Sequence, residues 1–228
     1  MAYVSLAELI QAVRTGAALI SFPTDTVPAL ASHPDQAQHI FEAKQRNTQK
    51  PLILMAGTAD DLWPYVQGTA DEQQAWNAIT SQYWPGALTL VLPASDRIPT
   101  AMNPHNPTTL GIRVPDCAIA RHILSQTGPL ATTSVNRSGE PALLTADEIN
   151  RVFPEVLTLS PDALDELGRS LSQTSPATSN STAHLSIVNQ GNSQYNATTP
   201  STVIQWTGSG WNIVRQGRVA FDTSASNI

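Results

Sequence analysis

The sequence predicts an α/β or α+β domain built on a twisted sheet, and three observations lead to this expectation. Short apolar runs bounded by turn residues alternate with stretches whose apolar residues recur at helical spacing. The chain has 228 residues, of which 41% are hydrophobic, and this is enough for one sizeable core. No segment repeats at a fixed period. We therefore expect a single domain over residues 1–228.

The first half of the chain predicts a helix followed by alternating strands and helices. Ser5 can cap this first helix with Glu8 three residues later, and Gly16 stands where the helix should stop. The segments that follow have either strand-like apolar runs or helical spacing. We expect strands at 17–22, 52–55, 88–92 and 110–114, and helices at 35–44, 71–83 and 117–125.

The second half adds a buried strand, a helix, a polar segment and a hairpin. Residues 128–131 predict a short strand that enters a polar loop at 133–139, and Thr145 with Glu148 forms another capping box. Residues 169–200 are dominated by Ser, Thr, Asn, Gln and Ala, so we expect a flexible insert there. Residues 201–206 and 211–215 flank a glycine-containing turn and predict a hairpin.

Composition limits the function classes. The net charge of −6 argues against a protein coated in positive charge for nucleic acid, although it leaves room for a local basic cleft. No apolar run approaches the ~20 residues of a membrane helix, and the first fifteen residues do not resemble a signal peptide. The single cysteine, Cys117, rules out an internal disulfide framework and fits a reducing compartment. We expect a soluble, cytoplasmic protein.

Polar clusters follow several predicted strands. The loop at 133–139 presents hydroxyls, an amide and a glycine where open α/β sheets usually bind ligands, and Pro23-Thr24-Asp25-Thr26 follows the first strand. Either stretch alone could be ordinary turn chemistry. Lys44 and Arg46 end a predicted helix, and Lys50 is close in sequence. Residues two apart do not share a helix face, so we expect one of the pair to enter the following loop. Three cations so close together in an acidic chain predict an anion site.

Two further clusters complete the set of candidate residues. Thr109 and Arg113 lie on the same face of a strand, and Arg113 needs an anionic partner from the protein or from a ligand. Ser201 and Arg215 lie at the ends of the predicted hairpin. This inventory suits a nucleotide phosphate chain together with a small polar substrate that has a carboxylate. The sequence has no Walker loop, dinucleotide-binding glycine motif or nucleophilic triad, so we expect no catalytic nucleophile from the protein.

Seven motifs occur in the order in which they occur in the YrdC-like domain family, which includes the threonylcarbamoyl-AMP synthases. The resemblance runs from about Ala17 to Gly217. The motifs are Pro23-Thr24-Asp25-Thr26-Val27, Lys44-x-Arg46 with Pro51-Leu52, Trp84-Pro85-Gly86-x-x-Thr89, Arg113-x-Pro115, Ser134-x-Asn136-x-Ser138-Gly139, Ser201-Thr202-Val203 and Arg215-x-Gly217. The resemblance implies an α/β fold in which an open twisted sheet, flanked by helices, carries a large concave cavity.

The resemblance also implies an activity. A nucleotidyltransferase of this family makes L-threonylcarbamoyladenylate and pyrophosphate from L-threonine, bicarbonate and ATP, with Mg²⁺, for threonylcarbamoyladenosine formation on tRNA. By motif position, the ATP-binding residues would be Lys44, Arg46, Thr109, Ser134, Asn136 and Arg215. The threonine-binding residues would be Thr26, Arg113, Thr132 and Ser201. Partners implied in the same way are tRNA or double-stranded RNA and proteins that transfer the threonylcarbamoyl group onward.

This chain departs from the family pattern beside the implied threonine site. The family usually continues Thr-Asp-Thr-Val with Tyr-Gly-Leu-Gly, whereas this chain has Pro28-Ala29-Leu30-Ala31, and the segment between Thr26 and Lys44 is a few residues short. A diverged, non-catalytic module that binds a nucleotide or double-stranded RNA is therefore the alternative hypothesis. A third is carbamoyl transfer, as in hydrogenase-maturation proteins, but the companion domains of those proteins are missing here.

Overall fold

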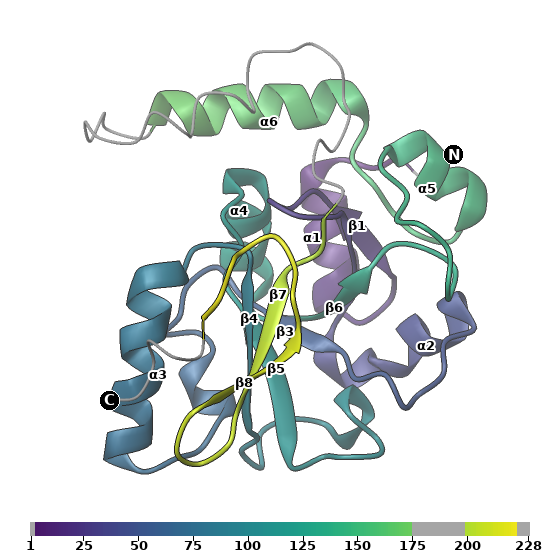
Figure 1. Ribbon diagram of the computed structural model, residues 1–228. Helices are drawn as coiled ribbons and strands as arrows, with labels where there is room; N and C mark the ends of the chain where they lie inside the picture. The colour runs from purple at the N-terminus through teal and green to yellow at the C-terminus, as the bar shows by residue number, and fades with distance from the viewer. Residues whose placement is uncertain (1–2, 175–198, 223–228) are drawn as a thin grey trace.

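The computed structural model describes residues 3–174 and 199–222, and in this part of the chain eight strands form one sheet flanked by helices (Figure 1). The α/β fold with an open sheet is therefore confirmed. The strands are β1 (Ile20–Phe22), β2 (Ala29–Ser32), β3 (Ile53–Met55), β4 (Leu88–Pro93), β5 (Thr109–Arg113), β6 (Leu130–Ser134), β7 (Thr202–Trp206) and β8 (Trp211–Arg215). Their order across the sheet is β1-β2-β6-β3-β5-β4-β7-β8.

The sheet is mixed, and its crossovers join distant parts of the chain. β3 pairs in parallel with β5, and β4 pairs in parallel with β7, whereas the other neighbours are antiparallel. The late hairpin β7–β8 therefore extends the sheet beyond β4, and β6 lies between β2 and β3. The predicted hairpin is confirmed.

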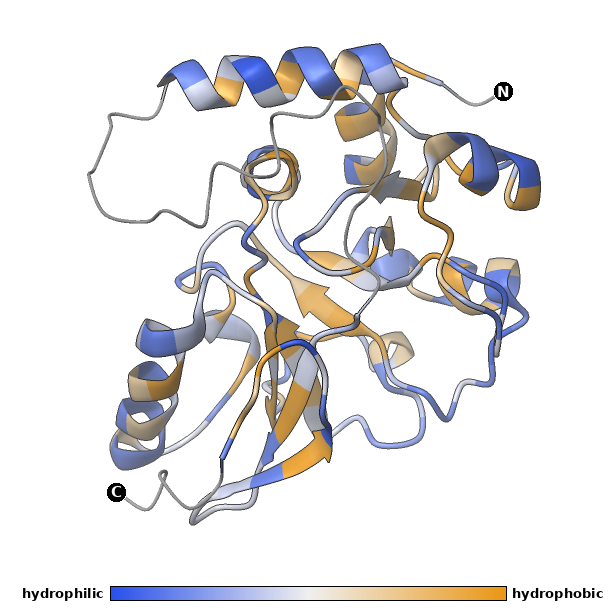
Figure 2. Cartoon of the chain, turned by 45° about the horizontal axis from the view of Figure 1, so that its top comes forward, coloured by the Kyte–Doolittle hydropathy of each residue, from blue (hydrophilic) through white to orange (hydrophobic). Residues whose placement is uncertain are grey.

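Helices flank the sheet, and several of their ends follow local capping rules. They are α1 (Leu6–Arg14), α2 (Gln38–Lys44), α3 (Ala70–Tyr83), α4 (Ala118–Thr127), α5 (Ala146–Val152) and α6 (Pro161–Thr174), with short 3-10 turns η1 (Pro34–Gln36), η2 (Trp63–Tyr65) and η3 (Thr100–Met102). The predicted capping boxes of α1 and α5 are present, and α3 has a third, formed by Thr69 and Glu72. In Figure 2 the strands are mostly hydrophobic, whereas the helices carry both hydrophobic and hydrophilic residues, as amphipathic helices do.

The hydrophobic core lies against one face of the sheet. Leu54, Leu90 and Ile204 come from three different strands, share this face by register and have no exposed surface. They belong to one cluster with Leu9 of α1 and Ile123 of α4. Helix α6 packs on α4 and extends this layer (Figure 1). No helix in the described residues is long and apolar enough to cross a membrane.

Several predicted boundaries were wrong. The first strand begins at Ile20 rather than Ala17. The helix expected at 35–44 is interrupted, because Pro34 starts a short 3-10 turn and α2 begins only at Gln38. Strand β2 was missed because its short, fully buried Ala-Leu-Ala-Ser sequence does not alternate. Helix α6 was also missed. Its last residues, Arg169–Thr174, are helical, although the sequence placed them in the polar insert. Residues 175–198 of the insert predicted at 169–200 lie outside the described residues.

Candidate functional site

The predicted site residues on the strands share one face of the sheet. Residues paired in register point to the same side, and residues two apart on a strand do so as well. Ile53 pairs with both Gly111 and Thr132, so these positions of β3, β5 and β6 face the same side of the sheet. By the same pairing, Val91 of β4, Val203 of β7 and Arg215 of β8 also face this side. The predicted residues on this face are Thr109, Arg113, Thr132, Ser134 and Arg215.

This face, unlike the face that carries the core, is partly exposed in the described residues, and we call it the open face. Ile53, Val91 and Val203 lie on central strands of the sheet, yet each is partly exposed. Their neighbours Leu54 and Leu90, which point the other way, are completely buried. Among the described residues, these three strands are therefore covered less on this face than on the face that carries the core. The cavity implied by the resemblance would lie over this face.

Lys44 reaches this region from the last turn of α2. The next residue, Gln45, has a left-handed backbone with φ 49°, so the chain leaves the helix and carries Arg46 into the loop, as expected. The Lys44 side chain is 1% exposed, and its ammonium donates to the Ser134 carbonyl and, at 2.8 Å, to Asn136 Oδ1. Burial lowers the pKa of Lys44 to about 7, and the positive charges of Arg46 and Lys50 contribute.

Asn136 organises the loop that Lys44 contacts. Its Oδ1 accepts from Lys44 and, at 2.7 Å, from Ser134 Oγ. Its Nδ2 donates to the carbonyls of Arg137 at 2.9 Å and Glu140 at 2.6 Å. The side-chain amide therefore uses both donors and both acceptor positions within the protein. In this arrangement Asn136 holds Lys44 and the loop together.

Arg46 and Arg215 bring two more cations to the open face. Arg215 donates to the Ser201 carbonyl at 2.8 Å and to Ser201 Oγ at 3.4 Å, and Arg46 donates to the Lys50 carbonyl at 3.3 Å. Partial burial lowers the pKa of both guanidinium groups, and the charge of Arg215 lowers that of Arg46 further. In residues 3–174 and 199–222, neither these two nor Lys44 forms an ion pair with a carboxylate. We call Lys44, Arg46 and Arg215 the cation cluster.

Arg113 differs from the cation cluster because the protein supplies its partner. Its Nη2 lies 2.6 Å from Asp25 Oδ1, its Nη1 donates to Thr26 Oγ1 at 2.8 Å, and its Nε donates to the Gly86 carbonyl at 3.0 Å. Burial lowers the pKa of this arginine, whereas the Asp25 charge opposes that shift. Sequence reasoning interpreted Asp25 only as part of a turn and missed this ion pair.

The predicted hydroxyls are close to buried partners. Thr132 Oγ1 donates to the Ile53 carbonyl at 2.9 Å, and Ser201 Oγ lies 2.9 Å from Thr89 Oγ1. Asn103 Nδ2 donates to Thr109 Oγ1 at 3.2 Å. Such contacts orient the hydroxyls and leave each with hydrogen-bonding capacity for a ligand. Thr89 was not among the predicted residues, although it belongs to the Trp84–Thr89 motif.

The segment after β8 crosses back to the Asp25 loop. Arg218 donates to the Asp25 carbonyl, and the Gly217 amide donates to Thr202 Oγ1 at 2.9 Å. A Cβ on Gly217 would lie 2.4 Å from the Pro200 carbonyl oxygen, so only glycine allows this close approach. The segment thereby joins Arg215 to the start of β7 and to the loop that pairs with Arg113.

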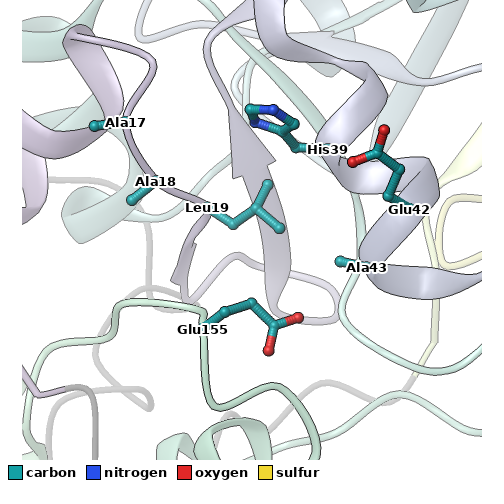
Figure 3. Close-up of a pocket in the computed structure, with 7 residues that line it drawn as sticks. All are labelled: Ala17, Ala18, Leu19, His39, Glu42, Ala43 and Glu155. Atoms are coloured by element: carbon teal, nitrogen blue, oxygen red, sulfur yellow. The ribbon is translucent and has the colours of Figure 1, made fainter.

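A separate pocket of about 330 Å³ lies beside α2 (Figure 3). Its side chains come from α2, from the segment before β1 and from the segment after α5. They are Ala17, Ala18, Leu19, His39, Glu42, Ala43 and Glu155. It contains none of the predicted site residues. No group of three His, Cys, Asp or Glu in the described part of the chain could hold a metal ion.

Comparison with known proteins adds evidence from sequence. Residues 11–165 match the protein family described as "Telomere recombination", which comprises Sua5, YciO and YrdC proteins. The chain is 35% identical over 169 residues to a threonylcarbamoyl-AMP synthase of Chromohalobacter salexigens. That alignment covers 72% of this chain and 88% of the relative.

Two solved structures share the fold. P. abyssi Sua5 complexed with L-threonine matches with a TM-score of 0.70 and 24% identity, over 94% of this chain and 55% of that chain. The present chain thus spans little more than half of that Sua5. E. coli YciO matches with a TM-score of 0.66 and 20% identity, over 93% of this chain and 88% of that chain. At these identities the two structures establish the fold alone.

Proposed function

The chain belongs to the Sua5, YciO and YrdC family, and we propose that it is a threonylcarbamoyl-AMP synthase, a nucleotidyltransferase that forms L-threonylcarbamoyladenylate. Its substrates are L-threonine, bicarbonate and ATP, and pyrophosphate is the second product. The observation that carries the proposal is the cation cluster, three side chains that have no carboxylate partner among the described residues and lie beside the open sheet face. A nucleotide triphosphate supplies the negative charge that such a cluster lacks.

The reactants themselves supply the nucleophile. The threonine amine adds to carbon dioxide derived from bicarbonate and loses a proton, which forms a carbamate. A carbamate oxygen then bonds to the α-phosphorus of ATP as the bond to the bridging oxygen breaks, and pyrophosphate leaves with that electron pair. The protein has to align the two substrates and stabilise charge on the phosphates.

The ATP site comprises residues around the cation cluster. Lys44, Arg46 and Arg215 contact the phosphate chain and stabilise the charge that develops on leaving pyrophosphate. Ser134 and Thr109 line the nucleotide side of the face. Asn136 acts on ATP through Lys44, because its amide is fully engaged within the protein.

The threonine site lies around the buried ion pair. Arg113 uses three of its five N–H groups on Asp25, Thr26 and Gly86, so two remain for the substrate carboxylate. Thr26, Thr132 and Ser201 contribute hydroxyls. Asp25 keeps the guanidinium in place before threonine arrives.

Magnesium enters this proposal as part of the nucleotide substrate. The described residues near the open face fit phosphate oxygens better than a protein-held divalent cation, since the cluster is positive and no three-ligand group is present in those residues. Mg²⁺ commonly binds proteins through substrate phosphates and water, with few protein ligands. We assign no protein ligand to it.

The product implies the setting in which the enzyme works. An acyl-adenylate of this kind is the activated donor for threonylcarbamoyladenosine modification of tRNA. We propose a cytoplasmic location and delivery of the adenylate to threonylcarbamoyl-transfer proteins, with tRNA as the final acceptor. The non-catalytic alternative is not favoured, because the cation cluster is intact and the relatives carry the synthase name.

Incubation with ATP, bicarbonate and radiolabelled threonine tests the proposal. We expect pyrophosphate and labelled adenylate to form in equal amounts, and Lys44→Ala and Arg46→Ala to lower kcat/KM for ATP by at least about tenfold, because each removes a charge-assisted contact. Arg97→Ala removes the same charge from an exposed loop and should retain full activity. ATP binding without any adenylate would contradict the synthase assignment, and full activity of both cluster variants would contradict the roles of these residues.

A further inference from the structure

Arg137 makes contacts that the proposed ATP and threonine sites do not explain. Its Nη1 donates to the Ala43 carbonyl at 2.8 Å, and its Nη2 donates to the Val152 carbonyl at 3.2 Å. The guanidinium carbon also lies 4.8 Å from the centre of the Phe153 ring. Ala43 is in the last turn of α2, and Val152 is the last residue of α5. One side chain therefore joins the carboxyl ends of two helices.

These helix ends are suited to a guanidinium group. The last carbonyls of a helix lack intrahelical partners and carry partial negative charge. The planar fork of arginine can donate to two of them at once, which a single ammonium cannot do with the same geometry. Phe153 is fully buried, so its ring gives the guanidinium a rigid surface to lie on.

The contacts of Arg137 close a ring around Lys44. Lys44 donates to Asn136, which is 92 positions away in the sequence. Asn136 donates to the Arg137 carbonyl, and the Arg137 side chain returns to Ala43, the residue before Lys44. The loop and the helix are thus connected both through Lys44 and beside it. Removal of the arginine side chain would abolish the contact at Ala43 and leave the Lys44 contacts in place.

We propose that Arg137 is a positioning residue for the ATP site, one that holds helix α2 and the Asn136 loop together so that Lys44 stays directed at the phosphate chain. The proposal rests on the proposed function of Lys44. In this proposal Arg137 acts through Lys44, because its guanidinium donates to two helix carbonyls and lies against the Phe153 ring. Its effect should therefore concern ATP and spare threonine.

Substitution of Arg137 tests this role through the two substrates separately. We expect Arg137→Ala to raise the KM and Kd for ATP by about three- to tenfold, the effect of one or two exposed charge-assisted hydrogen bonds, with the KM for threonine unchanged. Arg137→Lys keeps the charge but loses the fork, so its effect should be smaller. Arg151→Ala removes an exposed charge from the neighbouring helix α5 and should behave like the wild type.

A double-mutant cycle distinguishes positioning from general damage to the fold. If Arg137 acts through Lys44, then Arg137→Ala should have no further effect on ATP binding in a Lys44→Ala background. An additive effect in that background would overturn the inference. So would an equal rise in both KM values together with a lower melting temperature.

The same measurements separate this inference from the proposed function. A wild-type chain that binds ATP but forms no adenylate would contradict the synthase assignment, and the ATP Kd values of the variants would still decide the role of Arg137. A wild-type chain that does not bind ATP would overturn both.

Discussion

Lys44 is a buried lysine near other cations, and this makes its charge depend on pH near neutrality. With a pKa lowered to about 7, part of the free protein carries a neutral amine there. A bound triphosphate favours the charged form and raises the pKa. ATP binding should therefore take up protons, and affinity should fall as the pH rises above about 7.

Calorimetry in buffers of different ionisation enthalpy measures this uptake. We expect net proton uptake on ATP binding at pH 7.5, and its loss in Lys44→Met, an unbranched side chain that is only one atom shorter and carries no charge. Equal uptake in the wild type and in this variant would place the proton elsewhere. The stability of the fold depends on the same group. Between about pH 7 and 10.5 the Lys44 amine is protonated in the unfolded chain and largely neutral in the folded one. The contribution of Lys44 to the free energy of unfolding therefore rises with pH over that range, opposite to a lysine whose pKa is raised by folding.

The Asp25–Arg113 ion pair should matter for stability as well as for threonine. Both side chains are buried, at 10% and 4% exposure, so Asp25→Asn would leave a buried guanidinium without a counter-charge. We expect a loss of about 3 kcal/mol in the free energy of unfolding, measured with urea. Asp60→Asn, on the exposed surface, is the matched control. A loss no greater than that of the control would contradict this view of the pair.

At the residue scale, sequence motifs predicted which side chains gather and missed the contacts that orient them. Lys44, Arg113 and Ser134 are predicted site residues because they fall within family motifs, and their roles stay predictions. Asp25 and Arg137 could not be assigned their contacts, because both contacts join segments about ninety positions apart. No local pattern encodes such a distance.

At the element scale, the hairpin β7–β8 and the segment after it form a unit that depends on Gly217. A Cβ at this position would lie within 2.5 Å of the backbone at Ser201, so Gly217→Ala must displace the segment from β7. We expect a loss of about 1–3 kcal/mol in stability, typical of overpacking, and weaker ATP binding because Arg215 is two residues away.

Gly210→Ala provides the matched control for this prediction. Gly210 lies in the turn of the same hairpin, and a Cβ there would meet no atom within 4 Å. Urea unfolding and ATP titration of the two variants should therefore differ clearly. Wild-type behaviour of Gly217→Ala in both measurements would show that the segment can move without consequence.

Helices and strands were predicted correctly where the sequence carries a local pattern, such as a capping box or a glycine turn. The capping boxes of α1 and α5 and the glycine turn of the hairpin identified those elements correctly. Strand β2 has four buried residues and no alternation, so its pattern is that of neither an amphipathic strand nor a helix. Tertiary packing between β1 and β6 makes it a strand.

At the scale of the whole molecule, the cation cluster joins α2, the loop after it and β8. A ligand that binds all three should stabilise the entire fold. Tripolyphosphate at one hundred times its Kd should add about 2.7 kcal/mol to stability and raise the melting temperature by about 5–10 °C. Adenosine, which lacks phosphate, should have little effect at the same concentration.

Thermal unfolding with Arg215→Ala provides the control for this effect. The variant should lose most of the shift caused by tripolyphosphate, and 0.5 M NaCl should reduce the shift in the wild type because salt screens exposed charges. A shift that survives both changes would mean that the anion binds away from the cation cluster.

The parallel pairing of β4 with β7 has a consequence for the nascent chain. Until the hairpin leaves the ribosome, β4 is an edge strand with unpaired backbone groups, which is a site for pairing with another chain. The same hairpin that covers this edge carries Arg215 and follows Ser201. The cover on this edge and the proposed ATP-binding residue Arg215 are therefore completed by the same step of synthesis, and an unfinished chain lacks both.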